Sequence, residues 1–117
     1  MGRTAALTFA ALVALAAIPA LAHHGWSEYD STKLLKLSGK IVESGYEHPH
    51  GFIRLETPGK TWLCLLAPPS RMEARGLAKD LLMPGASVTV EGYANRAKPE
   101  EMRAERISAG GKTVELR

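Results

Sequence analysis

The four histidines of this chain occur in two short groups, and they are the side chains best suited to bind a metal ion. His23 and His24 form the first group, and His48 and His50 flank Pro49 in the second. Neutral imidazole nitrogen is a good ligand for copper, zinc and nickel. The two groups therefore predict a transition-metal site at these four histidines, with copper as the first candidate and zinc or nickel as alternatives.

Residues 1–22 have the features of a cleaved signal peptide. Arg3 supplies the basic start, residues 5–18 form an uncharged apolar stretch, and Ala20-Leu21-Ala22 matches the small-x-small pattern of a cleavage site. The apolar stretch is shorter than a membrane-spanning helix requires, so we expect no membrane span after cleavage. The sequence predicts export to the periplasm and a mature chain that begins at His23.

Cleavage at this position would add a metal ligand. The new α-amino group of His23 has an ordinary pKa near 7.7–8.0, so a metal ion can displace its proton. The amine and the imidazole of His23 would then chelate one ion, and a second imidazole would complete a T-shaped site of the kind that copper favours. The alternative is that His23 and His24 form a polar terminus and that His48-Pro49-His50 forms an exposed turn.

The charge and the single cysteine narrow the choice of partners. The formal charge is +3, and it falls to +2 when Arg3 leaves with the leader. Because basic and acidic residues are interspersed, we expect no nucleic-acid partner. Cys64 cannot form an internal disulfide, so in an oxidising compartment it is either a buried, inert thiol or one half of an intermolecular bridge.

Catalytic signatures are missing from the sequence. A chain of 117 residues has room for one small domain. It contains no Cys-x-x-Cys or His-Glu-x-x-His motif and no nucleophile elbow. We therefore expect a protein that is not an enzyme.

Other side chains are assigned structural roles. Trp26, Tyr29 and Tyr46 are expected to pack an N-terminal arm onto the domain, with a stacking surface for a ring-shaped or sugar ligand as the alternative. Trp62 is expected in the core. The sequence also predicts core positions for three methionines and solvated positions for four arginines. These are Met72, Met83, Met102, Arg71, Arg75, Arg103 and Arg106.

The mature chain reads as an irregular arm over residues 23–33 followed by one domain over residues 34–117. Alternating or continuous apolar residues, separated by turn formers, predict strands joined by one short helix. The expected strands are 34–44 (with a bulge or bend at Gly39), 52–57, 61–66, 87–93, 102–108 and 113–117. The helix is expected over residues 71–75, capped by Ser70 and Glu73 and ended by Gly76.

This order predicts a mainly all-β fold. Three strands, a helix and two or three further strands are the order of a five- to six-stranded OB-like Greek-key barrel. An antiparallel meander with one packed helix would give the same order of elements.

Short motifs along the mature chain resemble a family of small exported bacterial proteins of unknown function, the DUF6152 family. The resemblance is carried by Ala22-His23-His24-Gly25-Trp26, Pro49-His50-Gly51, Leu66-Ala67-Pro68-Pro69, Arg71-Met72, Arg75-Gly76-Leu77, Gly92-Tyr93 and Arg103-Ala104-Glu105. The family loop often reads Asn-Pro-His-Gly, so His50 matches the family and His48 departs from it. The resemblance implies an exported single-domain protein and no particular activity.

Three hypotheses follow for the function. The first is a periplasmic protein that binds a transition metal, most readily copper, for handling or delivery. The second is a binding or assembly module of the cell envelope that takes no metal and uses the barrel face with Trp26 and Tyr46. The third is a haem-handling barrel, which the sequence favours least because no histidine lies beyond residue 50.

Overall fold

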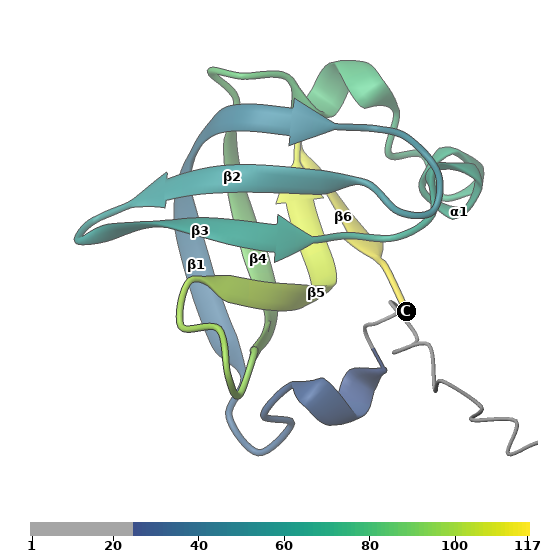
Figure 1. Ribbon diagram of the computed structural model, residues 1–117. Helices are drawn as coiled ribbons and strands as arrows, with labels where there is room; N and C mark the ends of the chain where they lie inside the picture. Colours follow the sequence, from purple (N-terminus) through teal and green to yellow (C-terminus); the bar gives the residue numbers. More distant parts are fainter. Residues whose placement is uncertain (1–24) are drawn as a thin grey trace, which may run out of the picture.

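A computed structural model describes residues 25–117, which form six strands and one short α-helix (Figure 1). The elements are η1 Trp26–Glu28, β1 Leu35–Gly45, β2 Phe52–Thr57, β3 Lys60–Leu65, α1 Pro69–Ala74, η2 Lys79–Leu82, β4 Ser87–Ala94, β5 Glu101–Ala109 and β6 Lys112–Glu115. The expected leader (residues 1–22) and the first two histidines, His23 and His24, lie outside the described residues. Within residues 25–117, no helix is long and apolar enough to cross a membrane.

The strands form one sheet that closes on itself. Their order is β3-β2-β1-β4-β5-β6, and a parallel pairing of β3 with β5 joins the two ends of a five-stranded barrel. β6 pairs with β5 beyond the closed part, and α1 connects β3 to β4. The OB-like barrel is therefore confirmed, and the parallel closure excludes the open antiparallel meander.

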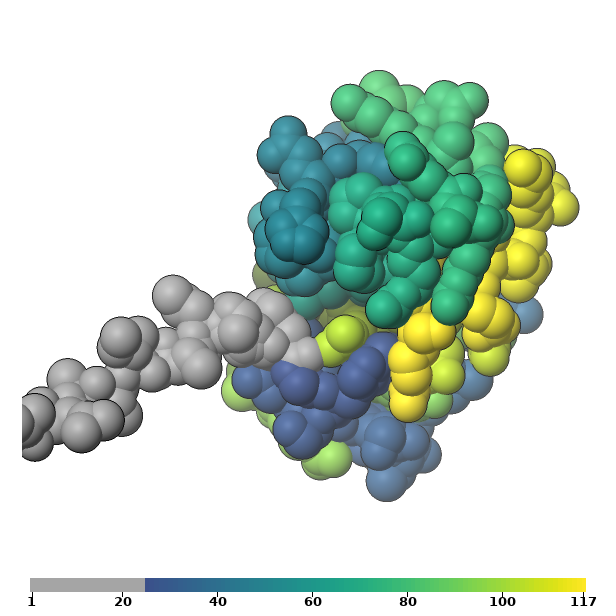
Figure 2. Space-filling model, turned by 90° about the vertical axis from the view of Figure 1, so that its right-hand side faces the viewer, coloured from purple at the N-terminus to yellow at the C-terminus, as the bar shows by residue number. Residues whose placement is uncertain are grey.

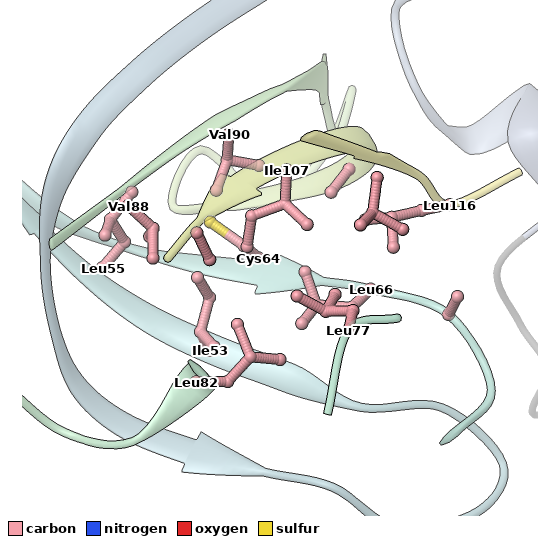
Figure 3. Close-up of a cluster of buried hydrophobic side chains, with 14 of the residues drawn as sticks. Ile53, Leu55, Cys64, Leu66, Leu77, Leu82, Val88, Val90, Ile107 and Leu116 are labelled. Atoms are coloured by element: carbon pink, nitrogen blue, oxygen red, sulfur yellow. The ribbon is translucent and has the colours of Figure 1, made fainter. Parts of the chain in front are cut away.

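The barrel interior holds the apolar side chains of alternate strand positions. Cys64 points into this core, and Leu65, its neighbour on β3, is buried as well. Thr61 is exposed and Leu63 is only half-buried, so the apolar run of residues 61–66 is covered on both faces only at its end. Figure 3 shows the inward-facing side chains from four strands, together with residues from the helical segment and the C-terminus. Labelled in that view are Ile53, Leu55, Cys64, Leu66, Leu77, Leu82, Val88, Val90, Ile107 and Leu116.

Gly39 and the bulge in β1 are separate features, although the sequence suggested that they coincide. The register against β2 shifts between Ile41 and Glu43, two residues after the expected place. Gly39 has another role, because a Cβ there would collide with the backbone carbonyl of Glu56. β1 pairs with both β2 and β4 at this point, and only glycine permits such a close approach of the backbones.

The helix begins earlier than predicted and without the expected cap. α1 starts at Pro69, its N-cap residue is Pro68, and no side-chain cap hydrogen bond is present. The predicted capping box of Ser70 with Glu73 is therefore wrong, because Ser70 already lies inside the first turn. Gly76 follows α1 with a φ of +85°, so its expected role in ending the helix is confirmed.

The described part of the arm, residues 25–33, packs along the end of β4. Tyr29 is 1% exposed and forms an isolated β-bridge with Asn95. The ring centroid of Trp26 lies 6.5 Å from that of Tyr29 and 6.2 Å from that of Tyr93, both edge to face. The expected packing of Trp26 and Tyr29 onto the barrel is confirmed.

The core assignments hold with one exception. Met72 and Met102 are fully buried, and Trp62 belongs to the core with its ring under the ammonium group of Lys60. Met83 is 46% exposed, so its predicted core position is wrong. It follows η2 in the turn that leads to β4, which lies outside the barrel.

Candidate functional site

The His48–Pro49–His50 segment lies in the loop between β1 and β2, and the barrel holds the base of this loop. The amide of Gly51 donates to the carbonyl of Ala67 at 2.9 Å, and the amide of Leu66 donates to the carbonyl of Gly51, also at 2.9 Å. A Cβ on Gly51 would lie 2.7 Å from Cε of Met72 and 3.1 Å from the carbonyl oxygen of Gly45, so a larger residue would have to displace the Met72 side chain. These contacts place His50 next to a fixed point of the backbone.

Tyr46 secures the other end of the same loop. Its hydroxyl donates to the carbonyl of Leu77 at 2.6 Å, and its ring packs against the core. Burial, and secondarily the nearby charge of Glu73, raises the pKa of Tyr46. Tyr46 therefore anchors the loop, which leaves its ring little room to act as a stacking surface.

The two loop histidines differ in their surroundings. His48 is exposed and precedes a cis peptide bond to Pro49, whereas His50 is half-buried with its Nδ1 shielded from solvent. Between residues 25 and 117, no group of three histidine, cysteine, aspartate or glutamate side chains is arranged to hold a metal ion. A metal site at His48 and His50 would therefore need ligands from His23 and His24, which lie outside the described residues.

The arm and the histidine loop lie on the same side of the molecule. Figure 2 shows both on one face, the arm in dark blue and the β1–β2 loop in blue-green. His23 and His24 directly precede Gly25, the first described residue of this arm.

Cys64 is too deeply buried to serve as a ligand or as one half of a bridge. Its side chain is fully shielded from solvent, and burial raises the pKa of its thiol to about 12. A thiol with such a pKa stays protonated and unreactive at neutral pH. Of the two roles left open for Cys64, the structure supports the buried, inert thiol.

A buried polar cluster joins the arm to the β4–β5 loop, and the sequence did not suggest it. Oε2 of Glu101 accepts hydrogen bonds from the hydroxyl of Tyr29 and from Nδ2 of Asn95, each at 2.9 Å. The side-chain oxygen of Asn95 in turn accepts from the amides of Ala97 and Lys98. The cluster is built by long-range contacts, so no local motif could have revealed it.

The four arginines for which the sequence predicted solvated positions make specific contacts. Arg106 lies between two carboxylates, Glu91 at 2.9 Å and Glu115 at 2.8 Å. Arg71 in α1 and Arg75, which directly follows α1, donate to backbone oxygens at the end of the chain. Arg103 is half-buried against Trp26 rather than on a solvated face, so its predicted position is wrong.

A shallow groove of about 410 Å³ lies on the outer face of β2 and β3. Arg54 and Leu63 supply its strand side, and residues 97–101 of the β4–β5 loop and the start of β5 supply the other. In OB folds this strand face and the β1–β2 and β4–β5 loops are the usual ligand-binding region. The groove and the histidine loop thus occupy two parts of a region that can bind ligands in this fold.

The chain belongs to a family of unknown function, DUF6152, whose model matches residues 10–102. This confirms the resemblance found in the short motifs, and it adds no activity. A search of the curated proteins gives no match.

Two solved structures illustrate what the barrel is similar to. One is a complex of TiaS with a tRNA and ATP, with 22% identity over 75% of this chain and 19% of that one, at a TM-score of 0.50. The other is the Stn1–Ten1 complex of S. pombe, with 15% identity over 65% of this chain and 57% of that one, at a TM-score of 0.52. The chain spans less than two thirds of either protein, so these likenesses concern the fold alone.

Proposed function

We propose that this protein is an exported, periplasmic metal-binding protein that takes a transition-metal ion, with copper as the first candidate and zinc or nickel as alternatives, in metal handling or delivery. Its ligands would be the amine and imidazole of His23, the imidazoles of His24 and His50, and His48 as a possible fourth. The observation that carries the proposal is the position of His50, beside a loop base that the barrel holds in place.

Rigidity at this position is relevant to metal affinity. The contacts of Gly51 with Ala67 and Leu66 fix the backbone one residue after His50. The arm is fixed in turn by Trp26 and Tyr29, a few residues after His23. Metal binding costs less conformational entropy when the backbone next to its ligands is already held by the barrel, as it is after His50 and at Trp26 and Tyr29.

The test is isothermal titration with Cu(II) and Zn(II) of protein that begins at His23, with the N-terminus verified by mass spectrometry. We expect binding tighter than 10 μM for copper, weakened at least tenfold in His50→Ala and by an added N-terminal tag that removes the free amine. His48→Ala should have a smaller effect, and Lys79→Ala, on an exposed turn, should have none. Equal affinity in the native protein and His50→Ala would contradict the proposal.

The second candidate is a binding or assembly module of the envelope that uses the barrel face and takes no metal. The groove between Leu63 and the β4–β5 loop favours it, because it lies where OB barrels usually bind ligands. Trp26 and Tyr46 give it less support than the sequence suggested, since both rings hold parts of the chain together.

A soluble oligosaccharide and a Leu63→Glu variant test this second candidate. Amide chemical shifts of residues 97–101 should move on titration in the native protein and not in Leu63→Glu, whereas the histidine variants should behave as the native protein does. If only metal ions shift amide signals, and only those of the β1–β2 loop, the groove is not the site.

A further inference from the structure

Four arginines that are distant in the sequence gather around the end of the chain. Arg71 lies in α1, Arg75 directly follows α1, Arg103 lies in β5, and Arg117 is the last residue. We call this group the arginine cluster. Figure 2 shows the end of the chain, in yellow, lying between α1 and the dark-blue arm on the face that also carries the β1–β2 loop.

Arg71 and Arg75 hold the backbone that follows β6. Nη1 of Arg71 donates to the carbonyl of Leu116 at 3.0 Å, and Nη1 of Arg75 donates to the carbonyl of Glu115 at 2.7 Å and to a carboxylate oxygen of Arg117 at 3.0 Å. The carbonyl of Leu116 carries no net charge, so its hydrogen bond positions the guanidinium group of Arg71 without cancelling the charge. The charge of Arg75 is partly balanced by the carboxylate of Arg117.

The other two arginines lie on the indole of Trp26. Cζ of Arg103 is 4.2 Å and Cζ of Arg117 is 4.0 Å from the ring centroid, within the range of cation–π contacts. Arg117 also pairs with Oε2 of Glu105 at 2.9 Å. Both guanidinium groups are thus packed against one indole ring.

This gathering places like charges near one another. The pKa of Arg103 is lowered, first by its partial burial and then by the charges of Arg117 and Arg71. Arg71, Arg75 and Arg117 are exposed to solvent, so an ion can reach them. Positive charge that is positioned, accessible and only partly balanced attracts an anion.

We propose that the arginine cluster is a binding site for a phosphate group, either free or carried as a monoester by a larger ligand. A guanidinium offers five N–H donors in a planar fork that matches phosphate oxygens. Arg71 and Arg75 use one nitrogen each for the backbone, which leaves further donors for a ligand. A dianion suits a cluster of four arginines whose positive charge is only partly balanced by Glu105 and by the carboxylate of Arg117.

The proposed phosphate site is separate from the proposed metal site. It uses none of the four histidines, so each proposal can fail without the other. It also gives a reason for the arginine cluster. In the sequence these arginines are interspersed with acidic residues, so the cluster could not be recognised there.

The test is titration of the native protein with inorganic phosphate and with glycerol phosphate, followed by calorimetry and thermal unfolding, at low ionic strength and without added metal. Sodium chloride at the same ionic strength is the control for general salt effects. We expect phosphate affinity to fall at least tenfold in Arg71→Gln and in Arg103→Gln. Arg106→Gln makes the same change in charge at an arginine that already pairs with two carboxylates, and it should change the affinity less than twofold.

Each outcome has a defined meaning. Stronger binding of the monoester identifies a larger ligand, whereas equal binding identifies phosphate itself. If Arg103→Gln does not fold, Arg103→Lys keeps the charge but removes the fork, and it should still weaken binding. Equal effects of phosphate and chloride, or equal losses in Arg71→Gln and Arg106→Gln, would overturn the proposal.

Discussion

Tyr29 donates its hydroxyl hydrogen to the buried carboxylate of Glu101, at 2.9 Å and across 72 positions of sequence. Asn95 donates to the same oxygen, and Tyr29 forms a β-bridge with Asn95. The carboxylate is thus the point at which the arm, the β4–β5 loop and β5 meet. It fastens the arm that follows His23 and His24 to the barrel.

Replacing Tyr29 with phenylalanine should lower the free energy of unfolding by about 2 kcal/mol, because a buried carboxylate loses one of its donors. Urea denaturation measures this loss. Tyr93→Phe, at a half-buried ring that also contacts Trp26, is the matched control and should change stability by less than about 0.5 kcal/mol. When Tyr29→Phe is made in the Glu101→Gln variant, it should lower the free energy of unfolding by less than it does in the native protein. An equal loss in both would show that Tyr29 and Glu101 stabilise the protein independently.

Gly39→Ala should destabilise the barrel by roughly 2–4 kcal/mol, because the added methyl group collides with the backbone of Glu56 and cannot turn away. Thermal or urea unfolding detects the change. Ser38→Ala, at the exposed neighbouring position, serves as the control. Comparable stability of the two variants would mean that β1 and β2 can separate slightly without cost.

Cys64 should resist thiol reagents in the folded protein, since its side chain is fully shielded and its raised pKa keeps the thiol protonated. We expect labelling by a disulfide reagent to be at least a hundredfold slower in buffer than in denaturant. Non-reducing gels of the protein kept in an oxidising buffer should show no disulfide-linked dimer. Rapid labelling under native conditions would contradict the burial of Cys64.

Alkaline pH should destabilise the protein in two stages. Burial raises the pKa of Cys64 from 9.0 to about 12, and burial with the Glu101 contact raises the pKa of Tyr29 from 10.0. The folded state therefore keeps each proton where the unfolded chain releases it. The stabilising contribution is complete below pH 9 for Cys64 and below pH 10 for Tyr29, and it is lost as the pH rises further.

The slope of stability against pH measures this effect. One such group lowers the free energy of unfolding by about 1.4 kcal/mol per pH unit in its window. Between pH 9 and 10, Cys64→Ala should therefore show a shallower fall than the native protein, because lysines and other groups titrate equally in both. Parallel curves of stability against pH for the two proteins would rule out a raised pKa of Cys64.

Most of the strands and the end of the helix could be predicted from local patterns in the sequence. Apolar alternation and turn residues placed the strands to within one or two residues, because these signals are local. Gly76 ended the helix for the same kind of reason, since its positive φ needs a residue without Cβ. The Ser70 cap failed because Pro68 and Pro69 already start the helix, and two competing local signals cannot be ranked without the backbone.

The contacts between residues that are distant in the sequence could not be predicted in this way. The pairing of β3 with β5 closes the barrel, and contacts across more than 40 positions bring Arg71 to Leu116 and Tyr29 to Glu101. The spacing of residues in the sequence did not predict which residues surround the exposed loop of His48 or the arginine cluster. Sequence periodicity records which face of a strand is buried, whereas the partners of a buried or charged group depend on how the whole sheet curves and closes.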